Sequence, residues 1–186
     1  MAVDPKDLVA TLEGPLRTIA EASQRGAVPD VPGFYAWWIE AGRLGPKDGR
    51  PHPLEPGFMS FYVGIAQRLR RRVVGNHIRG NTAASTFRFA LAALLREERG
   101  YQPRVRVDAR GRRKYVLGPD ENNDLSEWQA QHLRVTWAPC GDPRQLEHEV
   151  IQRLEPPLNS EHNSAHAFFG CLNRARRDFR AAAEPL

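Results

Sequence analysis

The sequence predicts a mixed α/β (α+β) domain with a small central, mostly antiparallel sheet of about three strands, flanked by helices and carrying an inserted hairpin. Its 186 residues are enough for one hydrophobic core and few for two. Short aromatic and β-branched runs alternate along the chain with longer segments in which apolar residues recur at helical spacing. This alternation favours a sheet covered by helices.

Three short segments are predicted as the strands of the central sheet. The first is rich in aromatic residues and is opened by Pro32-Gly33, and the second runs directly into Gly64. The third is a short apolar run in the last third of the chain. These strands are residues 31–39, 58–64 and 133–138.

Five segments are predicted as helices because apolar residues recur in them every three or four positions. Arg25-Gly26 is expected to end the first helix, and Asp142 to cap the fourth, which Pro156-Pro157 terminates. In chain order the helices are residues 7–24, the segment after Gly64 with Leu69 and Val73 facing inward, residues 85–98, residues 143–154, and a last helix within residues 165–179.

Two insertions are expected. Residues 40–57 are rich in glycine and proline and are predicted as a loop. Residues 97–131 form the second insertion, in which residues 104–107 and 114–117 alternate around a turn and predict the hairpin. Residues 118–125 are polar and are predicted as a loop.

Composition places the chain among ordinary globular proteins. No apolar run approaches the ~20 residues of a transmembrane helix, and residues 1–10 lack the pattern of a signal peptide. With only two cysteines, a reduced, cytoplasmic setting without membrane contact is expected. Residues 1–30 are predicted as an N-terminal helical extension and residues 31–186 as the functional domain.

The net charge of +5 is concentrated in two arginine clusters. Arg68 and residues 70–72 form the first, and the second lies within residues 174–180. Clustered arginine is typical of surfaces that bind a phosphate backbone. Solvated helix faces would give the same pattern, so charge alone leaves both interpretations open.

Three local features carry possible chemistry. Two predicted strands place a tyrosine near a glycine, in Gly33-Phe34-Tyr35 and in Tyr62-Val63-Gly64. The second strand leads into the arginine-rich helix, and Glu147 lies on a helix followed by Pro156-Pro157-Leu158-Asn159. Taken singly, each has a structural explanation, because strand tyrosines are usually core residues and helical glutamates are usually exposed.

In combination these residues resemble the GIY-YIG nuclease family. Gly33-Phe34-Tyr35 corresponds to the first family motif and Tyr62-Val63-Gly64 to the second. Arg72 follows the second tyrosine by ten residues, as the catalytic arginine does in the nuclease domain of the bacterial excision-repair incision subunit. Glu147 and Asn159, twelve residues apart, are similar to the family's metal-binding glutamate and terminal asparagine.

The resemblance implies a metal-dependent endonuclease that hydrolyses phosphodiester bonds, with nucleic acid, expected to be DNA, as its partner. It implies a Mg²⁺ or Mn²⁺ ion at Glu147, and a tyrosine that positions or deprotonates the attacking water, for which it favours Tyr35 over Tyr62. A homodimer is possible, because a compact nicking enzyme would need two copies to break both strands. The expected catalytic residues are Tyr35, Tyr62, Arg72, His77, Glu147 and Asn159. The residues expected to bind nucleic acid are Arg68, Arg71, Arg79, Arg88 and His162.

The sequence also departs from the family pattern. Twenty-six residues separate Tyr35 from Tyr62 where the family has about ten, and Ile65 stands where many members have lysine. One helical turn after Arg72, where the family often has histidine or tyrosine, stands Asn76, with His77 next to it. These departures keep two alternatives open: a nucleic-acid-binding module that no longer cuts, and a basic accessory subunit.

Overall fold

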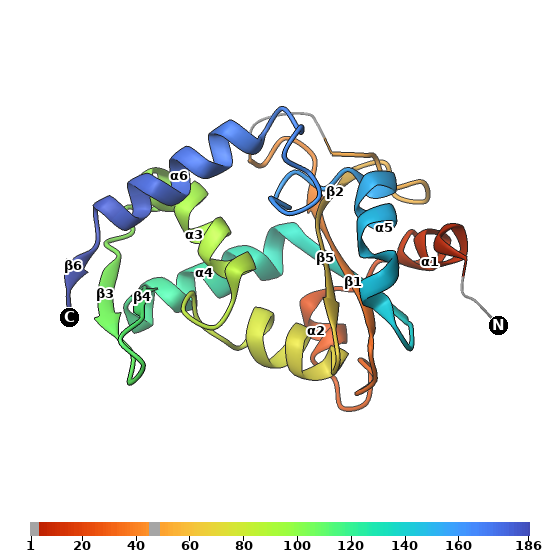
Figure 1. The fold of residues 1–186 in the computed structure, drawn as a ribbon, viewed down its shortest axis with the longest axis horizontal. Helices are drawn as coiled ribbons and strands as arrows, with labels where there is room; N and C mark the ends of the chain where they lie inside the picture. The colour runs from red at the N-terminus through yellow and green to blue at the C-terminus, as the bar shows by residue number, and fades with distance from the viewer. Residues whose placement is uncertain (1–3, 45–48) are drawn as a thin grey trace.

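A central antiparallel sheet organises the computed structural model, which describes residues 4–44 and 49–186. Its strands are β1 (Gly33–Glu40), β2 (Phe58–Ala66) and β5 (Leu133–Pro139), in the order β2-β1-β5, and both pairs are antiparallel. The prediction of a small three-stranded sheet flanked by helices is therefore confirmed (Figure 1).

The middle strand β1 is buried along almost its whole length because both faces of the sheet are covered. Side chains alternate between the two faces of a strand. Phe34 and Trp38 accordingly point into one apolar cluster, whereas Tyr35 and Trp37 point into the other.

Helices α1 (Pro5–Leu12) and α5 (Glu147–Leu154) cover the face that carries Phe34 and Trp38. The prediction of one helix over residues 7–24 is wrong, because the chain breaks after α1 at Gly14-Pro15 and starts again as α2 (Ile19–Ala22). Proline cannot continue a helix, and Thr18 restarts it with a capping box.

The other face of the sheet packs against η1 (Arg71–Ile78), α3 (Thr86–Arg99), α4 (Pro119–His132) and α6 (Phe169–Ala181). Ser85 accepts a hydrogen bond from the Arg88 amide, and a left-handed Gly100 ends α3. These caps place α3 where its apolar spacing predicts it.

The predicted loop over residues 118–125 is instead the first half of α4. Pro119 occupies the first turn, and the Glu121 carboxylate accepts the Gly118 amide at 2.8 Å. Several of the polar residues that suggested a loop are half-buried and bonded to neighbouring elements, as Asn122 is to Arg88, and Leu125 and Trp128 anchor the helix in the core.

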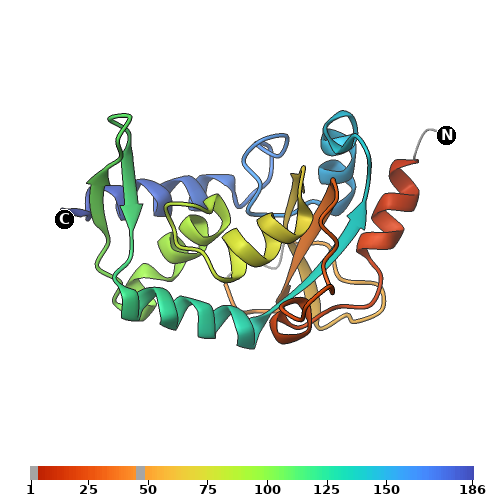
Figure 2. The same ribbon diagram turned by 90° about the horizontal axis from the view of Figure 1, so that it is seen from below.

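The predicted hairpin is present as β3 (Arg104–Val107) and β4 (Arg113–Val116), to which β6 (Glu184–Pro185) adds a short parallel strand. Figures 1 and 2 show this second sheet at the end of the molecule opposite α1. Helix α6 runs toward it from the loop beside the central sheet (Figure 1).

The predicted helix over residues 143–154 begins as a 3-10 turn, η2 (Pro143–Leu146), and becomes α-helical only at Glu147. Asp142 does not cap it, because its carboxylate accepts the Gln145 side-chain amide instead. A left-handed Glu155 ends α5 immediately before the two prolines.

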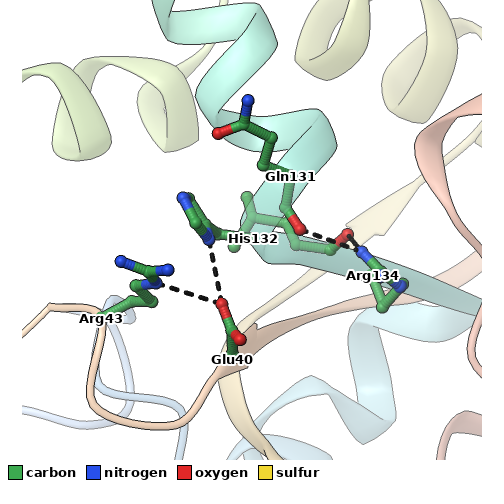
Figure 3. Close-up of polar contacts among 6 residues, drawn as sticks. Glu40, Arg43, Gln131, His132 and Arg134 are labelled. Atoms are coloured by element: carbon green, nitrogen blue, oxygen red, sulfur yellow. Dashed lines mark hydrogen bonds and ion pairs between the residues drawn. The ribbon is translucent and has the colours of Figure 1, made fainter.

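Glu40 ties the end of β1 to the junction between α4 and β5 (Figure 3). Its carboxylate accepts hydrogen bonds from Arg43 Nε at 3.1 Å and from His132 Nδ1 at 3.0 Å.

Residues 45–48 of the predicted loop over 40–57 lie outside the described residues. No helix within the described ranges 4–44 and 49–186 is long and apolar enough to cross a membrane.

Candidate active site

The two motif glycines leave space for close contacts in the sheet. Gly64 allows the Tyr35 ring to lie over it, and Gly33 allows β5 to approach β1. Tyr35 is paired with Gly64 across β1 and β2. A Cβ at Gly64 would lie 2.3 Å from Tyr35 Oη and 2.5 Å from its Cζ, so any side chain there would collide with the ring. At Gly33, a Cβ would lie 2.4 Å from the Ala138 carbonyl oxygen.

The side chain of Tyr35 is buried, with 2% of its area exposed to solvent. Its hydroxyl lies 2.9 Å from His77 Nε2. Burial raises the pKa of Tyr35 well above its ordinary value, and the neighbouring Tyr62 raises it further, whereas the Arg72 guanidinium opposes the shift. The phenol is therefore neutral at physiological pH.

The contact between His77 and Tyr35 depends on the winding of η1, which is a π-helix. In a π-helix, residues five apart share a turn, as shown by the hydrogen bond from the Arg79 amide to the Val74 carbonyl at 3.0 Å. His77 follows Arg72 by five residues. In the sequence, His77 stands one position beyond the place one α-helical turn after Arg72. The wider π-turn brings it back into contact with Tyr35.

His77 is enclosed on all sides, with 1% exposure. Its Nδ1 lies 2.6 Å from Ser85 Oγ, and the rings of Trp37 and Phe87 contact it edge-on. Burial, followed by repulsion from Arg72 and Arg88, lowers the pKa of His77 to about 3. The imidazole is therefore neutral and connects Tyr35 to the first turn of α3.

Tyr62 lies between this buried group and the surface. Its ring is partly exposed, stacks on Phe87 with centroids 5.3 Å apart and lies 6.2 Å from the ring of Tyr35. It lines a hollow together with Glu147 and Asn159. Of the two motif tyrosines, Tyr62 is the one that borders this open space.

Asn159, which lines the hollow, joins the segment after α5 to strand β2. Its Oδ1 accepts the Val63 amide at 2.9 Å, and its Nδ2 donates to the Val63 carbonyl at 2.8 Å. The side chain is buried, and the Leu158 amide adds a backbone hydrogen bond to Phe61 at 3.0 Å. This pairing attaches the segment after α5 to β2, beside Tyr62.

Glu147 is the first residue of α5, and its carboxylate is half-buried at the edge of the hollow. Burial and then the charge of Glu161 raise its pKa. Among the residues that the structure describes, Glu147 has no ion pair and no side-chain hydrogen bond, and no cluster of three or more potential metal-ligating side chains occurs. A single carboxylate fits Mg²⁺, which retains several waters and binds through one or two carboxylates and substrate phosphate.

The first arginine cluster divides between two faces of η1. Arg72 is half-buried and close enough to Tyr35 and His77 to influence their charge states. Arg68, Arg71 and Arg79, which were predicted to bind nucleic acid, line a separate hollow. This hollow contains none of the expected catalytic residues. Within it, Arg68 forms an ion pair with Asp30.

The prediction that Arg88 contacts nucleic acid is wrong, because its side chain is fully buried. Its Nη1 donates to the His77 and Ile78 carbonyls at 3.3 and 3.2 Å, and its Nη2 donates to Asn122 and Ser126 at 2.9 to 3.0 Å. Burial lowers its pKa to about 10, which leaves it charged at neutral pH. The polar run that precedes α3 resembles a surface segment, and only the packing of α4 over α3 reveals the interior position of Arg88.

His162 is exposed in the loop after Asn159, where its ring lies 5.2 Å from that of His148 and its φ is +61°. It also lowers the pKa of Glu147 electrostatically, which places it near the hollow.

The predicted site residues did not include Ser85, Arg176 or Arg180, although both arginines belong to the second arginine cluster. The signal for the two arginines was available, because residues four apart share one face of a helix.

The family model described as the GIY-YIG catalytic domain matches residues 33–178. No significant match was found among curated proteins or among solved structures. The matched range contains both tyrosine motifs, the π-helix, Glu147 and Asn159. The family match indicates a nuclease that acts on nucleic acid, and the chain belongs to the GIY-YIG catalytic domain family.

Proposed function

We propose that this chain is a divalent-metal-dependent endonuclease that hydrolyses phosphodiester bonds in DNA, with residues 31–186 as its nuclease domain. The observation that carries the proposal is the arrangement around one hollow: Tyr62, Glu147 and Asn159 line it, the ring of Tyr35 lies 6.2 Å from that of Tyr62, and Arg72 is close enough to Tyr35 to influence its pKa. Phosphodiester hydrolysis requires charge neutralisation and a positioned water. The side chains that could supply both are gathered there.

Glu147 is the residue that would hold Mg²⁺ or Mn²⁺, because its carboxylate borders the hollow and has no protein cation paired with it among the described residues. A bound divalent ion would polarise the scissile phosphate and stabilise the departing oxygen. Burial raises the pKa of Glu147, so a nearby positive charge would favour its ionised form. Metal binding and carboxylate ionisation would therefore support each other.

Arg72 would donate charge-assisted hydrogen bonds to the nonbridging oxygens of the same phosphate. Its half-buried position beside Tyr35 strengthens such a contact, because charges interact more strongly away from bulk water.

The positions of the tyrosines support different tasks. Tyr62 borders the hollow and would contact the attacking water. Tyr35 is buried, and its raised pKa makes it a poor base by itself. We therefore assign Tyr62 to the water, in place of Tyr35, which the family resemblance favours. Tyr35 would orient Tyr62 while its hydroxyl donates a hydrogen bond to His77 Nε2.

Asn159 would act as a positioning residue, holding β2 and the loop after α5 in register so that Tyr62 and Glu147 face the same phosphate. The expected products carry 3′-hydroxyl and 5′-phosphate ends, as the family resemblance implies.

A cleavage assay on supercoiled plasmid tests the proposal. Wild type is expected to nick or linearise the plasmid only with Mg²⁺ or Mn²⁺, and Glu147→Gln, which keeps the side chain's size, is expected to be inactive. Tyr62→Phe should lower the rate by about 10²-fold or more. Melting curves of each variant would show that the fold is retained.

The assay also separates the principal alternative. Salt-sensitive DNA binding by wild type and Glu147→Gln, without cleavage by either on plasmid, branched or single-stranded DNA, would favour a non-cutting binding module. Cleavage by Glu147→Gln equal to that of wild type would contradict the role given to this carboxylate.

A further inference from the structure

Two arginines of α6 face the same hollow as the candidate catalytic residues. Arg176 and Arg180 are one helical turn apart, and both line the hollow that contains Tyr62 and Glu147. Their spacing of four residues puts them on one face of α6, and they are the two arginines of the C-terminal cluster that line this hollow. The inference below rests on the proposed nuclease function and concerns how the substrate lies in that site.

Arg176 is a partly buried cation without a carboxylate partner in the part of the chain that the structure describes. Burial lowers its pKa, and its guanidinium donates a hydrogen bond to the Ser160 hydroxyl. Holding a guanidinium partly out of water is unfavourable unless an anion compensates. Because the hollow that Arg176 shares with Tyr62 is open to solvent, a substrate phosphate can be that anion.

Arg180 connects this hollow to a second one. Its guanidinium carbon lies 5.0 Å from the centre of the Phe89 ring, and the side chain lines both hollows. The second hollow is also lined by Arg72 from η1 and by Arg113 from β4. Cationic side chains from three separate elements therefore surround one continuous surface, in which Phe89 is shared.

Arg113 faces this surface through the pleat of the hairpin. Residues two apart on a strand point to the same side, and Tyr115, two positions along β4, contacts the Phe89 ring with centroids 6.2 Å apart. Arg106 lines neither hollow, although Lys114, its partner across the two strands, lines the second one. The hairpin thus presents Arg113 to the second hollow, and Arg106 does not border it.

We propose that Arg176, Arg180 and Arg113 bind phosphates of one substrate strand, so that the nucleic acid lies along α6 from Glu147 to the β3–β4 hairpin. Arg176 and Arg180 are about 6 Å apart along the helix axis, which is close to the rise of two nucleotides at ~3.4 Å each. Helix α6 extends from the loop beside the central sheet to the hairpin (Figure 1). Arg176 and Arg180 line the first hollow, and Arg180 and Arg113 line the second.

The proposal places the substrate on a different side of η1 from the one that the sequence indicated. Arg68, Arg71 and Arg79 line a hollow without candidate catalytic residues, and Asp30 already pairs with Arg68. The α6 surface, in contrast, is continuous with Tyr62 and Glu147.

Binding measurements test the proposal without requiring cleavage. All proteins would carry Glu147→Gln, and fluorescence anisotropy would follow a labelled DNA duplex and the matching single strand at several salt concentrations, without divalent ions. Arg176→Gln/Arg180→Gln is compared with Arg174→Gln/Arg177→Gln, which removes the same charge from the same helix at exposed positions that line neither hollow.

The site-facing double variant is expected to bind roughly 10- to 100-fold more weakly at a fixed salt concentration. The slope of log affinity against log salt should become shallower by about 2, whereas the exposed double variant should lose less affinity and slope. A second pair of variants, Arg113→Gln and Arg106→Gln, repeats the comparison at exposed positions of the hairpin, in case loss of Arg176 disturbs folding. Arg113→Gln should weaken DNA binding more than Arg106→Gln.

Equal binding by both members of each pair would overturn the proposal and leave the nuclease function intact, provided that wild type still cuts plasmid. Absence of DNA binding by the Glu147→Gln parent, together with absence of cleavage by wild type, would overturn both. Weaker binding confined to the variants at Arg176, Arg180 and Arg113 would support the proposed path.

Discussion

The neutral, buried state of His77 makes stability depend on pH in a way that a single substitution can isolate. Burial lowers the pKa of His77 to about 3, whereas a histidine in the unfolded chain has a pKa near 6.5. Between these two values the unfolded chain binds one more proton than the folded chain at this site. The free energy of unfolding therefore decreases as pH falls from about 6.5 toward 3, and the contribution is fully retained above 6.5.

The size of the effect follows from the separation of the two pKa values. At pH 5.0 the unfolded histidine is about 1.5 pH units below its pKa and nearly fully protonated, while folded His77 remains neutral. One unit corresponds to about 1.4 kcal/mol, so protonation of the unfolded chain destabilises the fold by about 2 kcal/mol at pH 5.0. At pH 7.5 the same contribution is close to zero.

Urea unfolding at pH 7.5 and 5.0, followed by tryptophan fluorescence, measures this difference in wild type and in His77→Gln. Glutamine keeps a hydrogen-bonding group between Tyr35 and Ser85 but does not titrate. Wild type should lose about 2 kcal/mol more than the variant between the two pH values, because contributions from other groups, including buried His52, cancel in the comparison. Equal losses in the two proteins would refute a buried, neutral His77.

Three further substitutions probe the scaffold around the site. Asn159→Ala should cost about 2 kcal/mol, since it leaves both polar groups of the Val63 backbone unpaired; urea unfolding measures it, and an unchanged stability would contradict the pairing. Gly64→Ala should destabilise by at least ~1–3 kcal/mol and lower cleavage, because the new Cβ would collide with Tyr35; a wild-type melting temperature would show that the ring does not cross there. Arg88→Met should cost about 3 kcal/mol or more in thermal denaturation, and Arg88→Lys should not restore it, because lysine lacks the planar fork that reaches both η1 and α4. Full stability of the lysine variant would argue against that requirement.

The strands and the residues brought to the hollow could be predicted from sequence because local patterns determine them. Gly33-Phe34-Tyr35 and Tyr62-Val63-Gly64 are short motifs in which the glycine and the tyrosine act on each other across two paired strands, so sequence position and spatial position coincide. Asn159 was predicted through the family resemblance, and the structure places its side chain against the Val63 backbone of β2.

Features that depend on tertiary packing could not be predicted. Helical spacing does not distinguish an α-turn from a π-turn, so the sequence left His77 one position away from its expected place, although the structure bonds it to Tyr35. The polar start of α4 likewise reads as a loop until Leu125 and Trp128 are seen in the core. Arg88 looks like a surface residue because its neutral partners come from segments distant in sequence.

Arg88 also explains why the insertion over residues 97–131 is part of the site's architecture. Its guanidinium binds the carbonyls of His77 and Ile78 on one side and Asn122 and Ser126 of α4 on the other. Those α4 groups compensate a charge that would otherwise be buried at considerable cost. Because the same charge holds the last turn of the π-helix, the position of His77, and through it that of Tyr35, depends on α4. The insertion that brings the β3–β4 hairpin toward the proposed substrate path therefore also stabilises the buried end of the candidate active site.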